Sequence, residues 1–202
     1  MVKVKKRWAK RVAAVALACA LGAGAVGSLL GCSSDSRSNS DEMSVAWTSN
    51  AGEYDLDPTN NYMGWQGSYL GIYEQLFRID ANFDPQPMLA ESAEMVNDTT
   101  WKITIREGVT FQNGNELNAQ AVKDCLNRTI SMNERAKKTL DIASMEADGN
   151  VLTVTTNSLD TGFKNELSEP VASIIDVNSG AAEDEPVGTG PYKIASVARS
   201  EE

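Results

Sequence analysis

Residues 101–114 read WKITIREGVTFQNG and hold the clearest strand signal in the chain. Apolar and polar residues alternate from Trp101 to Ile105, which predicts a strand with one buried face and one solvated face. The Asn113–Gly114 pair that follows is typical of a turn. Asn118 is then placed to cap a helix. We expect the buried face of that helix to contain Val122, Cys125, Leu126, Thr129 and Ile130.

Strand and helix signals alternate on both sides of this block. Toward the C-terminus, Asp148–Asn150 precedes the β-rich Val151–Thr156, which predicts a hairpin, and a short helix is expected around Phe163–Leu167. Toward the N-terminus, Met43–Thr48 predicts a first strand. One helical face is expected to contain Trp65, Tyr69, Ile72, Tyr73 and Leu76. Because no repeat period appears, these patterns predict a mixed fold, α/β or α+β.

The glycine-rich segment Pro186–Tyr192, PVGTGPY, precedes a predicted last strand at Lys193–Val197. It lacks the Lys-Ser/Thr of a phosphate-binding loop, and it leads into a strand rather than a helix. Two glycines that flank Thr189 therefore predict a chain reversal in which two backbones approach closely.

Charge and composition exclude several classes of function. The formal net charge is −10, and outside residues 1–31 the chain has 12 basic and 28 acidic residues, which disfavours binding to nucleic acid. No histidine is present, so His-dependent catalysis and His-containing metal sites are excluded.

The Asp55-x-Asp57-x-Thr59 spacing lacks the glycine and glutamate of a calcium loop, and we predict no metal site. Paired acids such as Asp55 and Asp57, or those at Glu183–Glu185, are the remaining basis for an enzyme, and ordinary solvation explains them.

The first 31 residues have the pattern of an export signal. Six basic residues lie between Lys3 and Arg11, and an uncharged stretch runs from Val12 to Leu30. A membrane-spanning helix is the alternative, but the Ala, Gly and Val content of the stretch favours a cleavable peptide. Leu29–Cys32 (LLGC) is similar to the lipobox of bacterial lipoproteins. That likeness implies cleavage before Cys32, diacylation of its thiol, and a stable anchor on the outer face of the cytoplasmic membrane.

Residues 32–42 are expected to form a flexible, lipid-anchored linker, because nearly all of them after Cys32 are Ser, Asn or charged. Cys19 would leave with the signal and Cys32 would carry lipid, so Cys125 would be the remaining cysteine and no internal disulfide could form. Its apolar neighbours at helical spacing predict that Cys125 is a small core residue.

Several of these segments together resemble family 5 solute-binding proteins, the peptide and nickel receptors of ABC importers. The block from Trp101 to Gly114, followed by Asn118–Lys123 (NAQAVK), is similar to the family's W-x-F-x-L-R-x-G-V-x-F-x-x-G block and the helix start after it. Shorter matches follow the family's order at Leu56–Pro58, Tyr73–Leu76, Pro87–Ser92 and Pro186–Tyr192. The resemblance spans residues 41–197.

This resemblance implies a lobe of the periplasmic-binding-protein-like type II fold, formed by residues 43–202 and interrupted before the second lobe. It implies a receptor rather than an enzyme, without a cofactor, which captures an oligopeptide or a metal chelate and delivers it to an ABC permease in the membrane. Two other readings stay open: a truncated receptor fragment without function, and a carboxylate-based hydrolase. An incomplete sheet would leave unpaired edges that favour self-association.

Two pairs of residues are candidates for contacts with a ligand. Tyr62 and Trp65 stand at the start of the aromatic helix, where a helix end can face a cleft, although a structural role would explain them too. Arg135 and Lys138 belong to a basic cluster just after the Cys125 helix, and a solvated helix end is the alternative.

The resemblance implies that the segments around Asn61–Gln66 and Arg135–Lys138 contribute to the cleft of nickel-type receptors, which adds Gln66 to the candidates. Arg135 matches an arginine of that pattern. Lys138 stands where the nickel pattern has a tryptophan, and Val171 lies near the place of a second pocket arginine. These departures argue against specific binding of a nickel complex.

Overall fold

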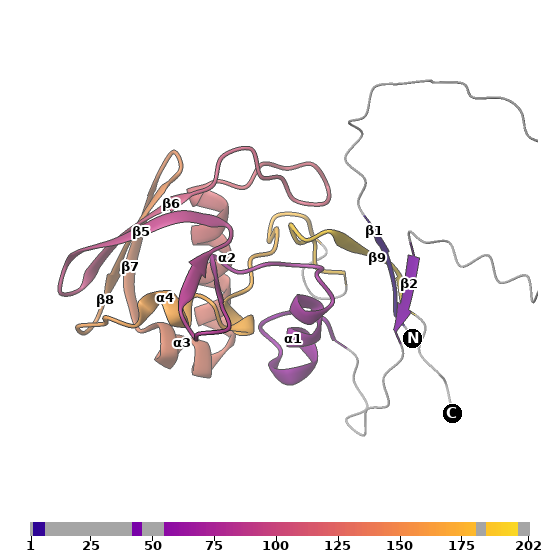
Figure 1. Cartoon of the computed structure of the whole chain (residues 1–202), viewed down its shortest axis with the longest axis horizontal. Coiled ribbons are helices and arrows are strands. Elements are labelled where there is room, and N and C mark those ends of the chain that lie inside the picture. The colour runs from indigo at the N-terminus through magenta and orange to yellow at the C-terminus, as the bar shows by residue number, and fades with distance from the viewer. Residues whose placement is uncertain (1, 7–41, 46–54, 181–184, 198–202) are drawn as a thin grey trace, which may run out of the picture.

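The main sheet of the protein has four antiparallel strands. The computed structural model describes residues 2–6, 42–45, 55–180 and 185–197. The strand order is β5 (Ala90–Asn97), β6 (Thr100–Ile105), β8 (Val151–Thr156) and β7 (Ile142–Asp148). Helix α2 (Ala119–Met132) packs against β7 and β8 and covers one face of this sheet (Figure 1). The mixed fold predicted from the sequence is confirmed.

Strand β6 has the two faces that its alternation predicts. Trp101, Ile103 and Ile105 are at most 5% exposed, whereas Lys102 between them is exposed. The register places Ile103 between Ala93 of β5 and Leu152 of β8. Apolar side chains of neighbouring strands therefore share the face that packs on α2, which is the burial that stabilises the sheet.

A polar cap fixes the start of helix α2. The Asn118 side chain accepts a hydrogen bond from the Ala121 amide at 3.0 Å, so the predicted cap of α2 is confirmed. The chain then starts a separate helix, α3 (Glu134–Leu140), and the basic cluster lies within this helix. The remaining helical elements are α1 (Asn61–Tyr69), α4 (Phe163–Glu166) and the 3₁₀ turn η1 (Pro170–Ala172).

Cys125 is a buried core residue, as its neighbours predict. It is 1% exposed, and its thiol lies 3.5 Å from the Ser173 carbonyl and 3.4 Å from the Ile175 amide. Burial raises the pKa of the Cys125 thiol to about 11, so the group stays protonated at neutral pH.

The aromatic helix is shorter than its apolar spacing predicts. Helix α1 ends at Tyr69, and Gly71 adopts a φ of +67°, which turns the chain out of the helix. Tyr73 folds back beneath α1, where its hydroxyl donates to the Leu56 carbonyl at 2.8 Å. The expected single helical face is therefore wrong beyond Tyr69, because the chain turns at Gly71 and the Tyr73 ring packs closely against Gly67.

The Pro186–Tyr192 segment forms the close backbone approach that its glycines predict. The Gly190 amide donates to the Ile72 carbonyl at 3.1 Å, and the Tyr192 amide donates to the Gly71 carbonyl at 3.0 Å. A Cβ atom on Gly190 would lie 2.1 Å from the Gly71 carbonyl oxygen. Gln112 secures the junction from the loop after β6, with its amide nitrogen 2.7 Å from the Ile72 carbonyl oxygen.

Two smaller sheets complete the fold (Figure 1). One is a hairpin, and the other joins both ends of the chain in the order β2-β1-β9. The expected first strand at Met43–Thr48 is present as β2 over Glu42–Val45, and the rest of the predicted segment, Trp47 included, lies outside the described residues. The bounds are β1 (Val2–Lys6), β2 (Glu42–Val45), β3 (Phe77–Ile79), β4 (Pro85–Pro87) and β9 (Tyr192–Val197).

Strand β1 was not expected, because residues 1–31 have the pattern of an export signal. The apolar stretch of that segment, Cys32 and most of the 32–42 linker lie outside the described residues. Among the helices that the structure describes, none has the length and apolar character to span a bilayer.

Candidate functional site

Two of the predicted ligand contacts, Trp65 and Arg135, lie together. The Arg135 guanidinium carbon is 5.1 Å from the centre of the Trp65 ring, which is a cation–π contact between α3 and α1. Arg135 Nη2 also lies 3.4 Å from Glu169 Oε2, beside the 3₁₀ turn. The Arg135 side chain remains 62% exposed. Residues 70 positions apart in the sequence thus form one cationic, aromatic surface, which we call the Trp65–Arg135 pair.

The Trp65 indole carries an unused donor. Its Nε1 atom is buried and has no hydrogen-bond partner among the described residues. A buried N–H group without a partner costs free energy, and such groups are rare in folded proteins. An acceptor that reaches this nitrogen would recover that cost.

The other three candidates are placed less closely. The Tyr62 side chain lies outside the described residues, although its backbone belongs to α1. Gln66 is half-buried next to Trp65 on α1. Lys138 is exposed on α3, and within the described part of the chain no hydrogen bond or ion pair joins it to Trp65 or Arg135.

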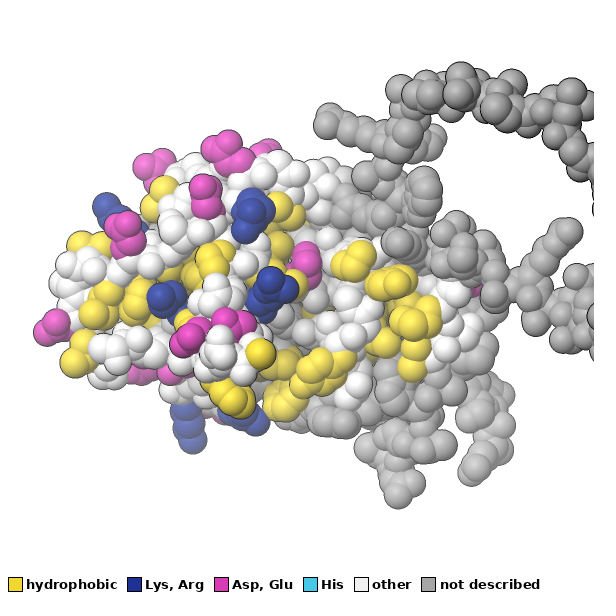
Figure 2. Space-filling view, in the orientation of Figure 1, with side chains coloured by type: hydrophobic (Ala, Val, Ile, Leu, Met, Phe, Trp, Pro, Cys, Tyr) yellow, Lys and Arg dark blue, Asp and Glu magenta, His cyan; other side chains and the backbone are white. Residues whose placement is uncertain are grey.

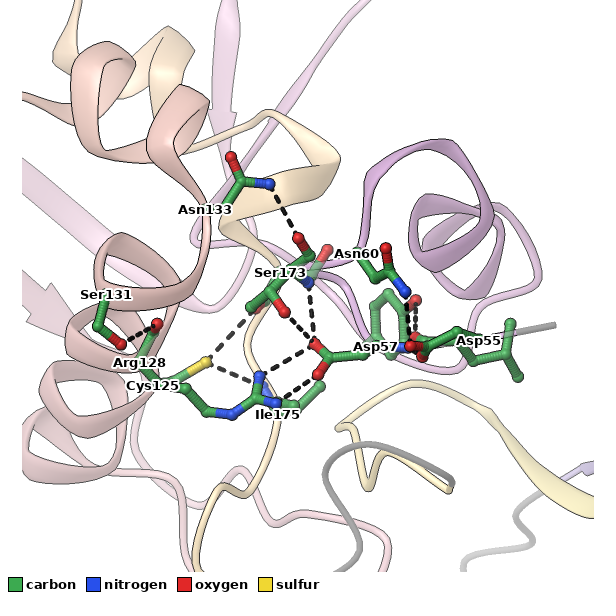
Figure 3. A network of polar contacts seen from close by, with 12 residues as sticks. Asp55, Asp57, Asn60, Cys125, Arg128, Ser131, Asn133, Ser173 and Ile175 are labelled. Carbon is green, nitrogen blue, oxygen red and sulfur yellow. Dashed lines mark hydrogen bonds and ion pairs between the residues drawn. The ribbon is translucent and has the colours of Figure 1, made fainter. Parts of the chain in front are cut away.

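A buried ion pair holds the loop that precedes α1. Asp57 is 2% exposed, and its carboxylate receives a bidentate contact from Arg128 of α2, with Nη1 3.0 Å from Oδ1 (Figure 3). The same Oδ1 accepts hydrogen bonds from the Thr59 amide and hydroxyl at 2.9 and 2.8 Å. Asp55 accepts from the Asn60 side chain at 2.6 Å. Asp55 and Asp57, one of the two sets of acids that could have suggested an enzyme, are thus engaged in holding this loop, whereas most of the other set, Glu183–Glu185, lies outside the described residues.

Asn133 connects this loop to the helix that carries Arg135. Its side-chain oxygen accepts from the Ala136 amide at 2.9 Å and caps α3. Its side-chain nitrogen donates to the Thr59 carbonyl at 2.9 Å (Figure 3). One buried residue therefore sets the start of α3 relative to the loop before Trp65. The sequence signal for this role is an amide residue, Asn133, directly before an acidic first turn that begins with Glu134.

Among the described residues, the surface around α1 and the loop before it does not enclose a pocket of ligand size. Hydrophobic side chains gather over the part of the molecule where α1 lies, and Tyr69 of this helix is 68% exposed (Figure 2). The cavity beside the loop is lined by Asp55, Asp57, Thr59, Asn60 and Met132, and it has a volume of about 200 Å³. Ligand pockets usually enclose roughly 300–1,000 Å³. A ligand held here would need a second surface opposite α1.

Glu166 lies near other acidic residues, among them Asp160 and Glu169. Burial, followed by the negative charge of Asp160, raises the pKa of Glu166 to about 7. Its Oε2 atom is buried without a partner among the described residues, and a proton on Glu166 would allow a hydrogen bond to Asp160. Glu166 therefore stabilises the fold most below its ordinary pKa of 4.5, and this contribution is lost as the pH rises through about 7.

Replacement of Glu166 by glutamine is expected to stabilise the protein more at pH 8 than at pH 5, because glutamine stays neutral at both values. After a discount for the partial exposure of the side chain, the two differences in unfolding free energy should differ by about 1 kcal/mol. Urea unfolding of both proteins at both pH values measures this. An equal effect at pH 5 and pH 8 would show that Glu166 has an ordinary pKa.

Comparison with known proteins gives consistent matches. Residues 84–202 match the family described as "Bacterial extracellular solute-binding proteins, family 5 Middle". The nickel-binding protein NikA of Staphylococcus aureus is 34% identical over 132 residues, which cover 65% of this chain and 27% of NikA. The glutathione-binding protein GsiB of Escherichia coli O1:K1 / APEC is 32% identical over 166 residues, which cover 76% of this chain and 32% of GsiB.

Solved structures agree with these matches. The crystal structure of a nickel ABC transporter from Bacillus halodurans superposes with a TM-score of 0.69 at 40% identity, covering 72% of this chain and 30% of that one. NikA from S. aureus, crystallised with Ni(L-His)2, gives a TM-score of 0.69 at 31% identity, covering 73% of this chain and 31% of that one. The chain therefore spans about a third or less of the length of the relatives it matches.

Proposed function

Because the chain belongs to the family 5 bacterial extracellular solute-binding proteins, we propose that it is the substrate-binding component of an ABC importer. In this role it captures a solute outside the cytoplasmic membrane, delivers it to a permease and breaks no bond. The ligand is an oligopeptide or a metal chelate, in keeping with relatives named for binding glutathione and nickel. The anchor is a diacylated Cys32, followed by a polar linker that ends where β2 begins, at Glu42.

The Trp65–Arg135 pair carries this proposal. The aromatic face and Glu169 hold Arg135 in place, yet the guanidinium is mostly exposed and keeps donors for an incoming anion. Guanidinium groups bind carboxylates by two parallel hydrogen bonds. A peptide C-terminus and an amino-acid chelate of nickel both present carboxylates, so this one feature serves either class of ligand.

The Trp65 indole supports the same assignment. Its N–H group has no partner in the described part of the chain, and it can donate to a second oxygen of the ligand once the indole or its surroundings shift. Gln66 lies beside Trp65 and adds an amide that can both donate and accept. Lys138, one turn after Arg135, extends the proposed contact surface along α3, and Tyr62, whose backbone belongs to α1, stays a candidate from the sequence.

Substitution of Arg135 by alanine is expected to weaken binding of a carboxylate ligand about tenfold, because a hydrogen bond to a charged group contributes roughly 1.5–3 kcal/mol. Isothermal titration calorimetry with a short peptide and with the nickel–histidine chelate measures this. The matched control is Lys137→Ala, which removes a cation of similar exposure, 63%, from the same helix.

The control variant should bind as the unchanged protein does. Equal losses in both variants would mean that only the general positive charge of α3 matters, and they would contradict a site at the Trp65–Arg135 pair. An absence of measurable heat with both ligands would favour the reading of the chain as a receptor fragment without binding function. Release of cleaved peptide during the titration would favour a hydrolase.

A further inference from the structure

We propose that capture of a carboxylate ligand at the Trp65–Arg135 pair is coupled to uptake of a proton by Glu166, so that the ligand binds more tightly at mildly acidic pH than at alkaline pH. The coupling concerns the regulation of that same site, and it therefore rests on the proposed function. It is transmitted by a chain of contacts that leads from Arg135 through Glu169 to Glu166.

Glu169 is the internal partner of the Arg135 guanidinium. Its Oε2 atom lies 3.4 Å from Arg135 Nη2, and its side chain is 38% exposed. An incoming carboxylate that forms two parallel hydrogen bonds with the guanidinium competes with Glu169 for the same positive charge. Even where Glu169 stays in contact, the ligand adds a second negative charge beside it. Ligand binding therefore leaves the charge of Glu169 less compensated.

Glu166 is held in the same turn as Glu169. The Glu169 amide donates to the Glu166 carbonyl at 3.1 Å, so the two acids cannot separate without loss of this turn. The Oε2 atom of Glu166 is buried and has no hydrogen-bond partner among the described residues. A buried carboxylate oxygen without a donor is costly as an anion, and a proton on Glu166 removes this cost.

The groups that act on Glu166 are acidic. Helix α4, which carries Glu166, packs against α3 and β3 (Figure 1), and its Phe163 contacts Trp101 of β6. Asp160 in the loop after β8, Glu169 beside η1 and Asp141 at the end of α3 each disfavour the ionised form of Glu166. The other charged side chains of the packed elements are exposed, so solvent screens them: Arg78 of β3, Lys102 of β6, and Glu134, Arg135, Lys137 and Lys138 of α3.

The direction of the pH dependence follows from these charges. Burial and the neighbouring acids raise the pKa of Glu166 to about 7. A ligand carboxylate on Arg135 adds negative charge to this group of acids, and it raises the pKa of Glu166 further. A group whose pKa is higher in the complex takes up a proton on binding. The affinity is therefore highest below pH 7, and it falls as the pH rises through the pKa of the free protein and then that of the complex.

Isothermal titration calorimetry of the full chain with N-acetyl-trialanine tests the coupling, because this probe carries one carboxylate and no group that titrates between pH 6 and pH 8.5. One unit charge about 6 Å from another in water changes an ionisation equilibrium about threefold. We therefore expect about threefold tighter binding at pH 6 than at pH 8.5. Titrations near pH 7.2 in two buffers of different ionisation enthalpy should show uptake of about 0.3 proton per ligand. Because the chain has no histidine, few other side chains titrate in this range.

Glu166→Gln removes the titrating group and keeps its size. This variant should bind the probe equally well at pH 6 and pH 8.5, without proton uptake. The matched control is Glu107→Gln, which removes an exposed carboxylate from the loop after β6, outside α3, α4 and β3. The control should keep the about threefold change with pH of the unchanged protein.

A second measurement needs no ligand. Arg135→Gln removes the cation that compensates Glu169, as a bound carboxylate would, and it should raise the pKa of Glu166 so that its proton affinity increases about threefold. Carbon-13 NMR titration of the glutamate carboxyl groups measures this, with Glu166→Gln to assign the signal. Lys137→Gln, which removes a cation of 63% exposure from the same helix, should change the pKa of Glu166 less.

These measurements separate the coupling from the proposed function. Binding of the probe without proton uptake, or proton uptake that persists in Glu166→Gln, would overturn the coupling and leave the binding site standing. An unchanged titration of Glu166 in Arg135→Gln would overturn the coupling too. A probe that binds at neither pH would overturn both, because no carboxylate would then be captured at the Trp65–Arg135 pair.

Discussion

Replacement of Asp57 by alanine should destabilise the folded chain by about 3 kcal/mol, because removal of one member of a buried ion pair leaves the other charge without its partner. The Arg128 side chain is only 17% exposed, and the bidentate contact with Asp57 links α2 to the loop before α1. The Thr59 amide and hydroxyl would lose their acceptor in the same substitution. Urea unfolding at pH 7 measures the loss.

The double variant Asp57→Leu with Arg128→Met is the control for this prediction. When both charges are replaced by apolar groups of similar size, stability often returns to its original value or exceeds it. We therefore expect the double variant to be more stable than Asp57→Ala. If Asp57→Ala changes the unfolding free energy by less than about 1 kcal/mol, the pair is no more than an exposed salt bridge, and its proposed role in holding the loop is wrong.

Gly190→Ala is expected to destabilise the fold by about 3 kcal/mol, at the upper end of the usual cost of overpacking. The added Cβ would lie 2.1 Å from the Gly71 carbonyl oxygen and 2.8 Å from the Ile72 carbonyl oxygen. Both are backbone atoms, so no side-chain rotation can relieve the clash. The hydrogen bonds that join Pro186–Tyr192 to the segment after α1 would break, and the midpoint of urea unfolding would fall.

The matched control for Gly190 is Gly162→Ala. There the nearest atom to an added Cβ is Asp160 Oδ1, at 3.5 Å, which is an ordinary van der Waals distance. The expected change is below about 1 kcal/mol, in the range of substitutions at a helix N-cap. Equal effects at the two glycines would refute the close approach at Gly190 and attribute the loss to glycine content alone.

Local patterns predicted the elements whose stabilising contacts come from nearby residues. The alternation in β6 and the cap at Asn118 each depend on a few neighbouring side chains, and the structure confirms both. The close approach at Gly190 was also readable, because glycine is the residue that permits it. Helix α1 was overestimated because Ile72, Tyr73 and Leu76 keep a helical spacing although the chain leaves the helix after Tyr69.

The Trp65–Arg135 pair shows how far a sequence pattern can reach toward a site. Both residues were candidates from their local positions and from the family resemblance, but their mutual distance was not predictable. The contact exists because Asn133 caps α3 and also binds the loop before α1. Glu169, which pairs with Arg135, was not a candidate, because nothing near it in the sequence indicates a cation.

The sequence by itself determined the strand and helix types, the acidic character of the chain, the absence of imidazole chemistry and the likeness to solute-binding receptors. The tertiary structure alone decided that Asp57 meets Arg128 across 71 positions, that Trp65 meets Arg135, and that β1 lies between β2 and β9. The physical reason is range. Periodicity, caps and turns are set by neighbours a few residues away, whereas these contacts form only when separate elements pack and exclude water between them.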